Sequence, residues 1–183
     1  MEKPAKVDRR ILRTRDAITK SFLALVSEKD LDHITINDIA DRANVNRGTL
    51  YLHYADKYAL LDECIKDHID RMIAVCGAEA VNPIDDLKPM FAYFEANYAF
   101  FHTMLSNQKT SVFRDRLLQG IAAGTKAKIG ALAARQNMDL ELVARFLASA
   151  FVGTAEWWIL NRMPIPAELA AKQVGELFEK FVR

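Results

Sequence analysis

Two short helical patterns joined by a tight turn, within residues 34–65, constrain the fold of this chain more than any other feature. Thr35 is followed three residues later by Asp38, the spacing at which a hydroxyl and an acid together cap the first amides of a helix. Ile39 and Ala40 then continue one apolar face. The pattern predicts a short helix that begins just after Thr35.

A second short helix follows the turn. Asn44 suits the left-handed backbone that the turn needs, because after Gly it adopts that backbone at the least cost. Asn46 is a suitable N-cap, and Leu50 and Tyr54 return to the apolar core. The residues that remain on the outward face of this helix are Arg47, Gly48, Thr49, Tyr51 and His53.

An outward face of this composition matches what a reader of the DNA major groove requires. Arg47 carries the paired donors that fit N7 and O6 of guanine, and Thr49 suits a base edge or a thymine methyl group. Asn46 with the first amides of its helix is expected at a phosphate, and Asn37 at a phosphate or a base. The sequence therefore predicts a helix-turn-helix with double-stranded DNA as its partner.

The same residues resemble the N-terminal domain of the tetracycline-repressor (TetR) family of bacterial transcription regulators. The family's run of Ile-Ala, Val and Leu-Tyr-x-His-aromatic-x-x-Lys stands here as Ile39-Ala40, Val45 and LYLHYADK at residues 50–57. Asn44 replaces the usual Gly and Asn46 the usual Ser or Thr; both keep the backbone and capping chemistry, so they bear on base preference more than on fold. The gapless motif covers roughly the first third of the chain, and the remainder resembles the family only in being helical and apolar.

The resemblance implies further DNA contacts. Tyr51 and His53 match family positions that touch the DNA backbone or groove edge. Thr35 and Lys57 match positions that hold phosphates and so fix the register. The complete predicted DNA-binding set is Thr35, Asn37, Asn46, Arg47, Gly48, Thr49, Tyr51, His53 and Lys57.

Composition and charge add limited constraints. With 183 residues, 51% of them hydrophobic and 27% charged, the chain is expected to be globular, with one large or two small domains. The net charge of +1 does not by itself indicate nucleic acid, but residues 1–20 carry seven basic and three acidic side chains. This segment is either a basic arm that lies along phosphates or an ordinary solvated N-terminus.

The sequence predicts a cytoplasmic protein. Its first residues are charged and do not resemble a signal peptide, and no run approaches the roughly twenty apolar residues of a membrane span. Cys64 and Cys76 lack a Cys-x-x-Cys spacing, so buried reduced thiols are expected, with a redox switch as the alternative.

Helical periodicity without strand alternation predicts an all-α fold. We expect a helix-turn-helix DNA-binding domain over residues 1–60 and a helical effector-binding and dimerisation domain over residues 61–183. Asn97 is expected to cap a helix that begins at Tyr98, and Pro89 to lie in the first turn of the helix before it. The other expected helices cover residues 9–27, 56–76, 87–97, 98–105, 113–134, 140–161 and 167–182, with breaks at 77–83 and 107–111.

The last two helices are predicted to form a homodimer. Small residues between Leu147 and Ala155 permit a close helix approach, and Trp157 and Trp158 follow them. Intramolecular core is the alternative, but helix-turn-helix units commonly bind two half-sites about 34 Å apart as dimers. In the family that the chain resembles, the final two helices make the dimer. The expected interface residues are Phe151, Trp158, Leu177, Phe178 and Phe181.

Aromatic residues crowd into positions 91–104 and either fill a core or line a pocket. Tyr98 and His102 form an i, i+4 pair that would place two polar tips within an apolar cavity. Such a mixture, together with the resemblance, implies a small apolar or aromatic effector. The expected pocket residues are Phe91, Phe94, Tyr98, Phe101, His102, Met104, Phe113 and Trp157.

Nothing in the sequence indicates catalysis, a cofactor or a metal. Glycine-rich phosphate loops, His-Glu-x-x-His and Gly-x-Ser-x-Gly patterns are missing, and the four histidines do not share a metal-like spacing. We therefore expect a sequence-specific transcriptional regulator, a repressor that an effector releases from a palindromic operator. The alternative is a TetR-like co-regulator or activator that acts through a protein partner without a small effector.

Overall fold

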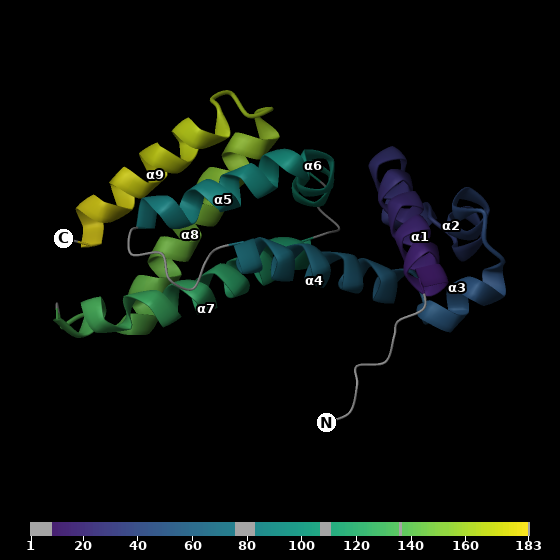
Figure 1. Cartoon of the computed structure of the whole chain (residues 1–183), viewed down its shortest axis with the longest axis horizontal. Coiled ribbons are helices and arrows are strands. Elements are labelled where there is room, and N and C mark those ends of the chain that lie inside the picture. The colour runs from purple at the N-terminus through teal and green to yellow at the C-terminus, as the bar shows by residue number, and fades with distance from the viewer. Residues whose placement is uncertain (1–8, 76–82, 107–110, 136, 183) are drawn as a thin grey trace. The chain divides into compact units, whose positions relative to one another are not determined.

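A computed structural model describes residues 9–75, 83–106, 111–135 and 137–182, and over these residues the regular structure is helical (Figure 1). The chain divides into two compact units, Met1–Lys66 (unit 1) and Asp67–Arg183 (unit 2). This division falls inside helix α4, Lys57–Val75, six residues beyond the boundary expected at 60/61. The all-α prediction is confirmed.

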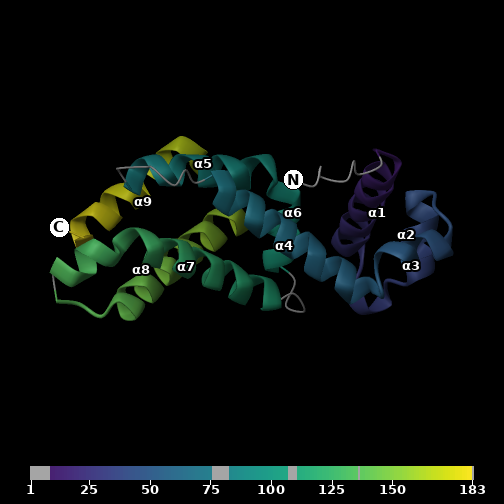
Figure 2. The same cartoon turned by 60° about the horizontal axis from the view of Figure 1, so that its bottom comes forward.

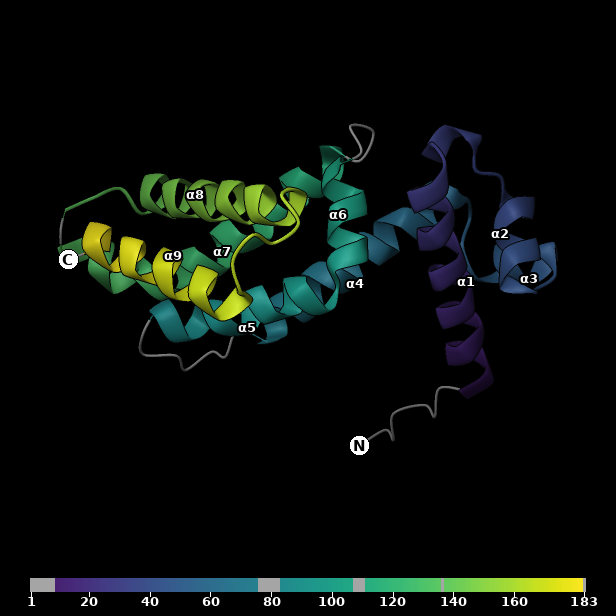
Figure 3. The same ribbon diagram turned by 90° about the horizontal axis from the view of Figure 1, so that it is seen from above.

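Unit 1 contains α1 (Arg9–Glu28), the 3-10 turn η1 (Leu31–His33), α2 (Ile36–Ala43), α3 (Arg47–His53) and the first half of α4. Helix α1 packs against α2, and α2 against α3 (Figure 3). Apolar side chains spaced three or four residues apart meet in its core, where water is excluded. The fully buried members are Ile18, Phe22, Ile39, Leu50 and Leu60.

Within the described residues, unit 2 contains the second half of α4 and five further helices. These are α5 (Pro83–Ala96), α6 (Tyr98–Ser106), α7 (Ser111–Arg135), α8 (Leu140–Leu160) and α9 (Ala167–Val182). Helix α5 lies beside α9 (Figure 1), and α7 beside α8 (Figure 2). Helix α4 contacts α7 closely, because a Cβ added at Gly120 would lie 3.1 Å from Ile69 and 3.2 Å from Ile73.

Two sequence-based predictions about the ends of α5 are wrong, whereas α6 begins at Tyr98 as predicted. Helix α5 begins at Pro83, so Pro89 lies inside the helix rather than in its first turn. The side-chain amide of Asn97 donates to the carbonyl of Tyr93 at 2.8 Å, so Asn97 closes α5 and does not cap α6. Both predicted breaks, at residues 77–83 and 107–111, fall almost wholly outside the described residues, as does Cys76.

Helix α8 is long and apolar enough to cross a membrane, with a mean hydropathy of 1.2 over its best 18-residue window. Length and composition alone do not distinguish such a span from the core helix of a domain. One face of α8 is buried within unit 2, where Leu147, Phe151 and Trp158 are each at most 5% exposed. Burial of this kind is what a core helix shows.

Candidate nucleic-acid interface and regulatory core

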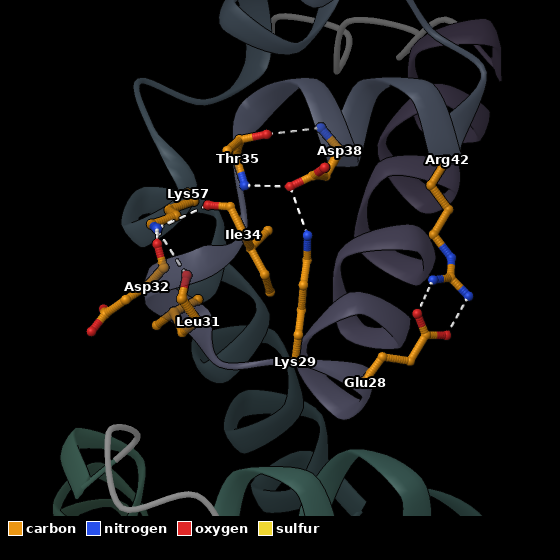
Figure 4. A network of polar contacts seen from close by, with 9 residues as sticks. All are labelled: Glu28, Lys29, Leu31, Asp32, Ile34, Thr35, Asp38, Arg42 and Lys57. Atoms are coloured by element: carbon orange, nitrogen blue, oxygen red, sulfur yellow. Dashed lines mark hydrogen bonds and ion pairs between the residues drawn. The ribbon is translucent and has the colours of Figure 1, made fainter.

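Helix α2 begins with the predicted cap (Figure 4). The amide of Asp38 donates to Thr35 Oγ1 at 3.1 Å, and the amide of Thr35 donates to Asp38 Oδ2 at 2.8 Å. Lys29 Nζ donates to the same carboxylate oxygen at 2.8 Å. These bonds, from Lys29 first and then Thr35, lower the pKa of Asp38 to about 2. The capping box thus ties the start of α2 to the end of α1.

The turn between α2 and α3 also forms as predicted. Asn44 adopts a left-handed backbone with φ of 52°. The amide of Gly48 donates to Asn46 Oδ1 at 2.8 Å, which caps α3. A Cβ at Gly48 would lie only 3.3 Å from that oxygen, so the glycine leaves room for the cap. The end of α2 and the start of α3 are therefore both set by residues within the turn itself, Asn44 and Asn46.

Leu50 and Tyr54 are buried, as predicted, and α3 presents its other residues to solvent. Arg47, Gly48 and Tyr51 are exposed, and Thr49 and His53 are half-buried. Thr35, the N-cap of α2, and Asn37 on α2 are also exposed. The predicted DNA-binding residues between Thr35 and His53 are therefore at least partly exposed to solvent. Their contacts with DNA remain predictions.

Arg47 and Tyr51 lie side by side on α3. Arg47 Nη2 donates to Tyr51 Oη at 3.1 Å, and the guanidinium carbon lies 5.4 Å from the centre of the ring. The i, i+4 spacing on a helix allows this contact. The ring holds the guanidinium against α3, so less side-chain freedom remains to be lost when Arg47 binds.

Lys57 occupies a different environment from the phosphate contact predicted for it. Its Nζ donates to the carbonyl oxygens of Leu31 at 2.8 Å, Asp32 at 2.9 Å and Ile34 at 2.9 Å (Figure 4). An ammonium group has three donors, and all three are used here. Lys57 therefore closes η1 and fixes the segment that leads into α2, and a phosphate would have to displace one of these carbonyls.

Ion pairs brace the remaining helices of unit 1. Arg42 on α2 forms a bidentate pair with Glu28 at the end of α1 (Figure 4), and Arg15 on α1 pairs with Glu63 on α4. Hydrogen bonds from Arg42 lower the pKa of Glu28. Arg15 and Lys20, two residues of the expected basic arm, are therefore engaged in ion pairs, because Lys20 also pairs with Asp16. Lys3 and Lys6 of that arm lie outside the described residues.

Four of the eight predicted effector-pocket residues, Phe91, Phe94, Phe101 and Phe113, belong to one aromatic cluster in unit 2. Phe94 and Phe101 meet edge to face with ring centres 4.7 Å apart, and Phe91 contacts Trp158 at 5.2 Å. Tyr98 and His102 are half-buried, and their ring centres lie 5.3 Å apart. The fully or almost fully buried predicted residues are Phe91, Phe94, Phe101, Met104 and Phe113.

A polar pair that the sequence analysis did not select lies in the same cluster. His68 on α4 is stacked on Phe100 with ring centres 3.7 Å apart, and its Nδ1 lies 3.1 Å from Tyr93 Oη. Burial, with a smaller effect from Arg71, lowers the pKa of His68 to about 4, so the ring is neutral at pH 7. In the sequence, the only indication of a buried His68 was its position beside the apolar positions of α4.

The two adjacent tryptophans do not lie where they were predicted: Trp158 is buried and Trp157 is exposed. Trp158, expected at a dimer interface, is 1% exposed and donates from Nε1 to the carbonyl of Ile165 at 2.8 Å. Phe151 is also buried within the unit. Trp157, expected in the pocket, is 53% exposed. Neighbouring helical residues point about 100° apart, so burying one of them turns the other outward.

Of the other predicted interface residues, Leu177 is exposed and Phe178 half-buried, while the side chain of Phe181 lies outside the described part. Leu142, Phe146 and Leu160 are exposed on α8 together with Trp157. Helical geometry places these four within about 60° of one another, so they form a single stripe. We call Leu142, Phe146, Trp157 and Leu160 the α8 stripe.

A capped helix-turn-helix with an exposed polar second helix, joined to a second all-helical unit, defines the class of helix-turn-helix DNA-binding regulators. Residues 18–64 match the family described as bacterial regulatory proteins, tetR family. Residues 82–180, more than half of the chain, match the family described as transcriptional regulator C-terminal region. The chain belongs to the TetR family of transcriptional regulators, a family of DNA-binding proteins and not of enzymes.

Individual relatives agree with this assignment. The repressor KstR2 of Mycobacterium tuberculosis is 26% identical over 191 residues, covering 90% of this chain and 88% of its own. The uncharacterised regulator YxbF of Bacillus subtilis is 47% identical over 66 residues, which are 36% of this chain and only 17% of YxbF. A TetR regulator of Streptococcus agalactiae has a similar structure, with a TM-score of 0.66, 27% identity and coverage of 93% and 96%.

Proposed function

We propose that this regulator is a cytoplasmic repressor, that it binds a palindromic operator as a homodimer, and that a small apolar or aromatic effector releases it. The observation that carries the proposal is the capped helix-turn-helix, whose second helix presents Arg47, Thr49 and Tyr51 outward from a fixed scaffold. KstR2, whose alignment with this chain covers 90% of the chain, is named as a repressor.

The proposed DNA contacts follow from side-chain chemistry. Arg47 reads guanine and Thr49 a base edge, while Tyr51, His53 and Thr35 contact the backbone. The Thr35 hydroxyl oxygen accepts a hydrogen bond from the Asp38 amide, so the hydroxyl proton remains available for a phosphate oxygen. Lys57 contributes by holding the loop before α2 in place.

The α8 stripe and Leu177 are the proposed dimer contacts. Several large apolar side chains on one exposed helix face are unusual for a protein that stays monomeric in water. A two-fold interface places the same patch on both copies, and the small residues Ser149 and Gly153 lie between Phe146 and Trp157 on this face. Close helix approach at these small residues would allow the stripe to bury itself against its copy.

The proposed effector site is the aromatic cluster with His68 and Tyr93 as its polar groups. A neutral imidazole and a phenol in an apolar surrounding can orient a ligand through hydrogen bonds while the rings supply apolar contact. We call α3 the recognition helix, and α4, which carries His68, follows it in the chain. An effector that binds more tightly to a displaced α4 would separate the two recognition helices beyond one-turn spacing and release DNA.

The tight packing of the aromatic rings favours a second possibility, a co-regulator or activator that responds to a protein partner. Rings in edge-to-face contact, such as Phe94 and Phe101, fill space that a ligand would otherwise occupy. In that case the apolar stripe on α8 would serve a partner protein rather than a second copy.

Fluorescence anisotropy of the purified protein against its own upstream DNA and a scrambled duplex, at several salt concentrations, tests the proposal. Selective binding by a dimer is the expected result, with an affinity that falls as salt rises. Equal, weak binding to both duplexes would contradict operator recognition by this chain alone. Addition of apolar or aromatic compounds to the selective complex then tests release, which fails if operator affinity stays unchanged.

A further inference from the structure

Helix α3 exposes one large side chain that has no polar group, that of Leu52. Leu52 is 84% exposed, the largest exposed fraction among the large apolar side chains of the described residues. It lies on α3 between Tyr51 and His53, inside the motif that matches the family. Single exposed leucines are ordinary on protein surfaces, so its position within α3 is what requires an explanation.

Helical geometry places Leu52 on the side of α3 opposite the core. Residues advance by about 100° around a helix, so Leu52 lies about 200° from the fully buried Leu50. Gly48, four residues earlier, shares this outermost line. The Arg47–Tyr51 pair lies on one side of the line and Thr49 on the other. The centre of the outward face, at Gly48 and Leu52, therefore carries no polar side chain, and polar side chains lie on both sides of it.

This arrangement fits the floor of the DNA major groove at an A·T base pair. Thymine presents a C5-methyl group there, and apolar side chains contact it without hydrogen bonds. The missing side chain at Gly48 lets the helix backbone approach the bases closely. Arg47 and Thr49 would then reach base edges or backbone on the two sides, as their chemistry requires.

We propose that Leu52 is a specificity-determining residue that reads a thymine methyl group in each half-site of the operator, and that Gly48 provides the close approach that this contact needs. The proposal rests on DNA recognition by α3 and adds a residue outside the predicted DNA-binding set. It explains why a large and highly exposed apolar side chain lies on the outward face of α3, beside the polar residues Tyr51 and His53.

Methyl removal from DNA tests the contact directly. The full-length protein is first used to select a duplex from a random pool. Each thymine of that duplex is then replaced singly by deoxyuridine, which removes the methyl group and keeps every hydrogen-bonding group. At one thymine per half-site, we expect the replacement to weaken binding by about fourfold, as the loss of one buried methyl predicts.

The Leu52→Ala variant should bind the thymine and uracil duplexes equally well at that position. Leu12→Ala, which shortens an exposed leucine on α1, is the matched control and should keep the fourfold difference. Thermal unfolding of both variants should equal that of the wild type, because neither leucine lies in the core.

Two results would overturn the proposal. If Leu52→Ala lowers the affinity for thymine and uracil duplexes by the same factor at every position, Leu52 contacts something other than a methyl group. If no duplex is selected by the wild-type protein, the reading of thymine is excluded together with operator recognition. In the first case the operator assignment survives, so the two failures are distinguishable.

Discussion

At the residue scale, Lys57 shows that a residue of the family motif can bind backbone carbonyls of the protein itself. Its ammonium group donates to three carbonyls of residues 31–34 and lies half-buried. These carbonyls precede α2, so Lys57 helps to fix the segment that leads into the helix-turn-helix. A motif residue can thus affect DNA binding without touching DNA.

Replacement of Lys57 by alanine should lower the free energy of unfolding by about 1–3 kcal/mol, because the three carbonyls lose a charged donor. Chemical denaturation of the full chain measures the change. Lys20→Ala, which removes an exposed partner of Asp16, should change the stability by less than about 1 kcal/mol. Unchanged stability with a reduced salt slope of DNA binding would return Lys57 to the predicted role of phosphate contact.

Arg47 is the residue on which base preference should depend most among the polar side chains of α3. Arg47→Ala is expected to cost about 1–3 kcal/mol of DNA binding and to relax specificity at one base pair. Anisotropy against duplexes with single base-pair changes measures both effects. Tyr51→Phe, which keeps the ring and removes the acceptor for Arg47, should retain the base preference. Equal loss of affinity across all duplexes in Arg47→Ala would show a backbone contact instead.

At the element scale, the start of α2 depends on an ionised carboxylate. Asp38 accepts from the Thr35 amide and from Lys29, and its pKa is lowered to about 2 from an ordinary value of 3.8. A lowered folded-state pKa means that the unfolded chain binds the proton more readily. The contribution of Asp38 to stability is therefore complete above pH of about 4 and is lost as the pH falls toward about 2.

The variant Asp38→Asn isolates this contribution from other carboxylates. Thermal unfolding midpoints of the wild type and the variant should differ most above pH of about 4, and the difference should shrink toward pH of about 2. Asp16→Asn, on the exposed surface of α1, should show little difference at any pH. A gap between wild type and Asp38→Asn that stays constant with pH would contradict the role of the ionised carboxylate.

At the scale of the whole molecule, the exposed stripe on α8 should control assembly and, through it, operator affinity. Trp157→Glu and Leu177→Glu each place a charge on the proposed interface and should shift the protein toward monomers in analytical ultracentrifugation. Operator affinity should fall in parallel, because one half-site contact is lost. Ala92→Glu adds the same charge at an exposed position on α5 and should leave the dimer intact. Dimers that persist in both interface variants would place the contact elsewhere.

Features that depend on near neighbours in the sequence were predictable. The capping box at Thr35 and Asp38, the left-handed Asn44 and the cap at Asn46 each involve contacts within four residues. Side-chain chemistry and helical periodicity therefore sufficed to predict the helix-turn-helix and its class of partner. The same local logic failed at Asn97, because its amide had an equally near acceptor at Tyr93 in the preceding helix.

The amino-acid sequence by itself determined the helices, the turn and the family, because these depend on residues three or four positions apart. Tertiary structure decided which side of an apolar helix is buried, and so placed Trp158 in the core and Trp157 outside. It also brought Lys57 to carbonyls 23–26 residues away and His68 to Tyr93, 25 residues away. Helical periodicity contains no information about such partners, since they are chosen by the packing of separate elements.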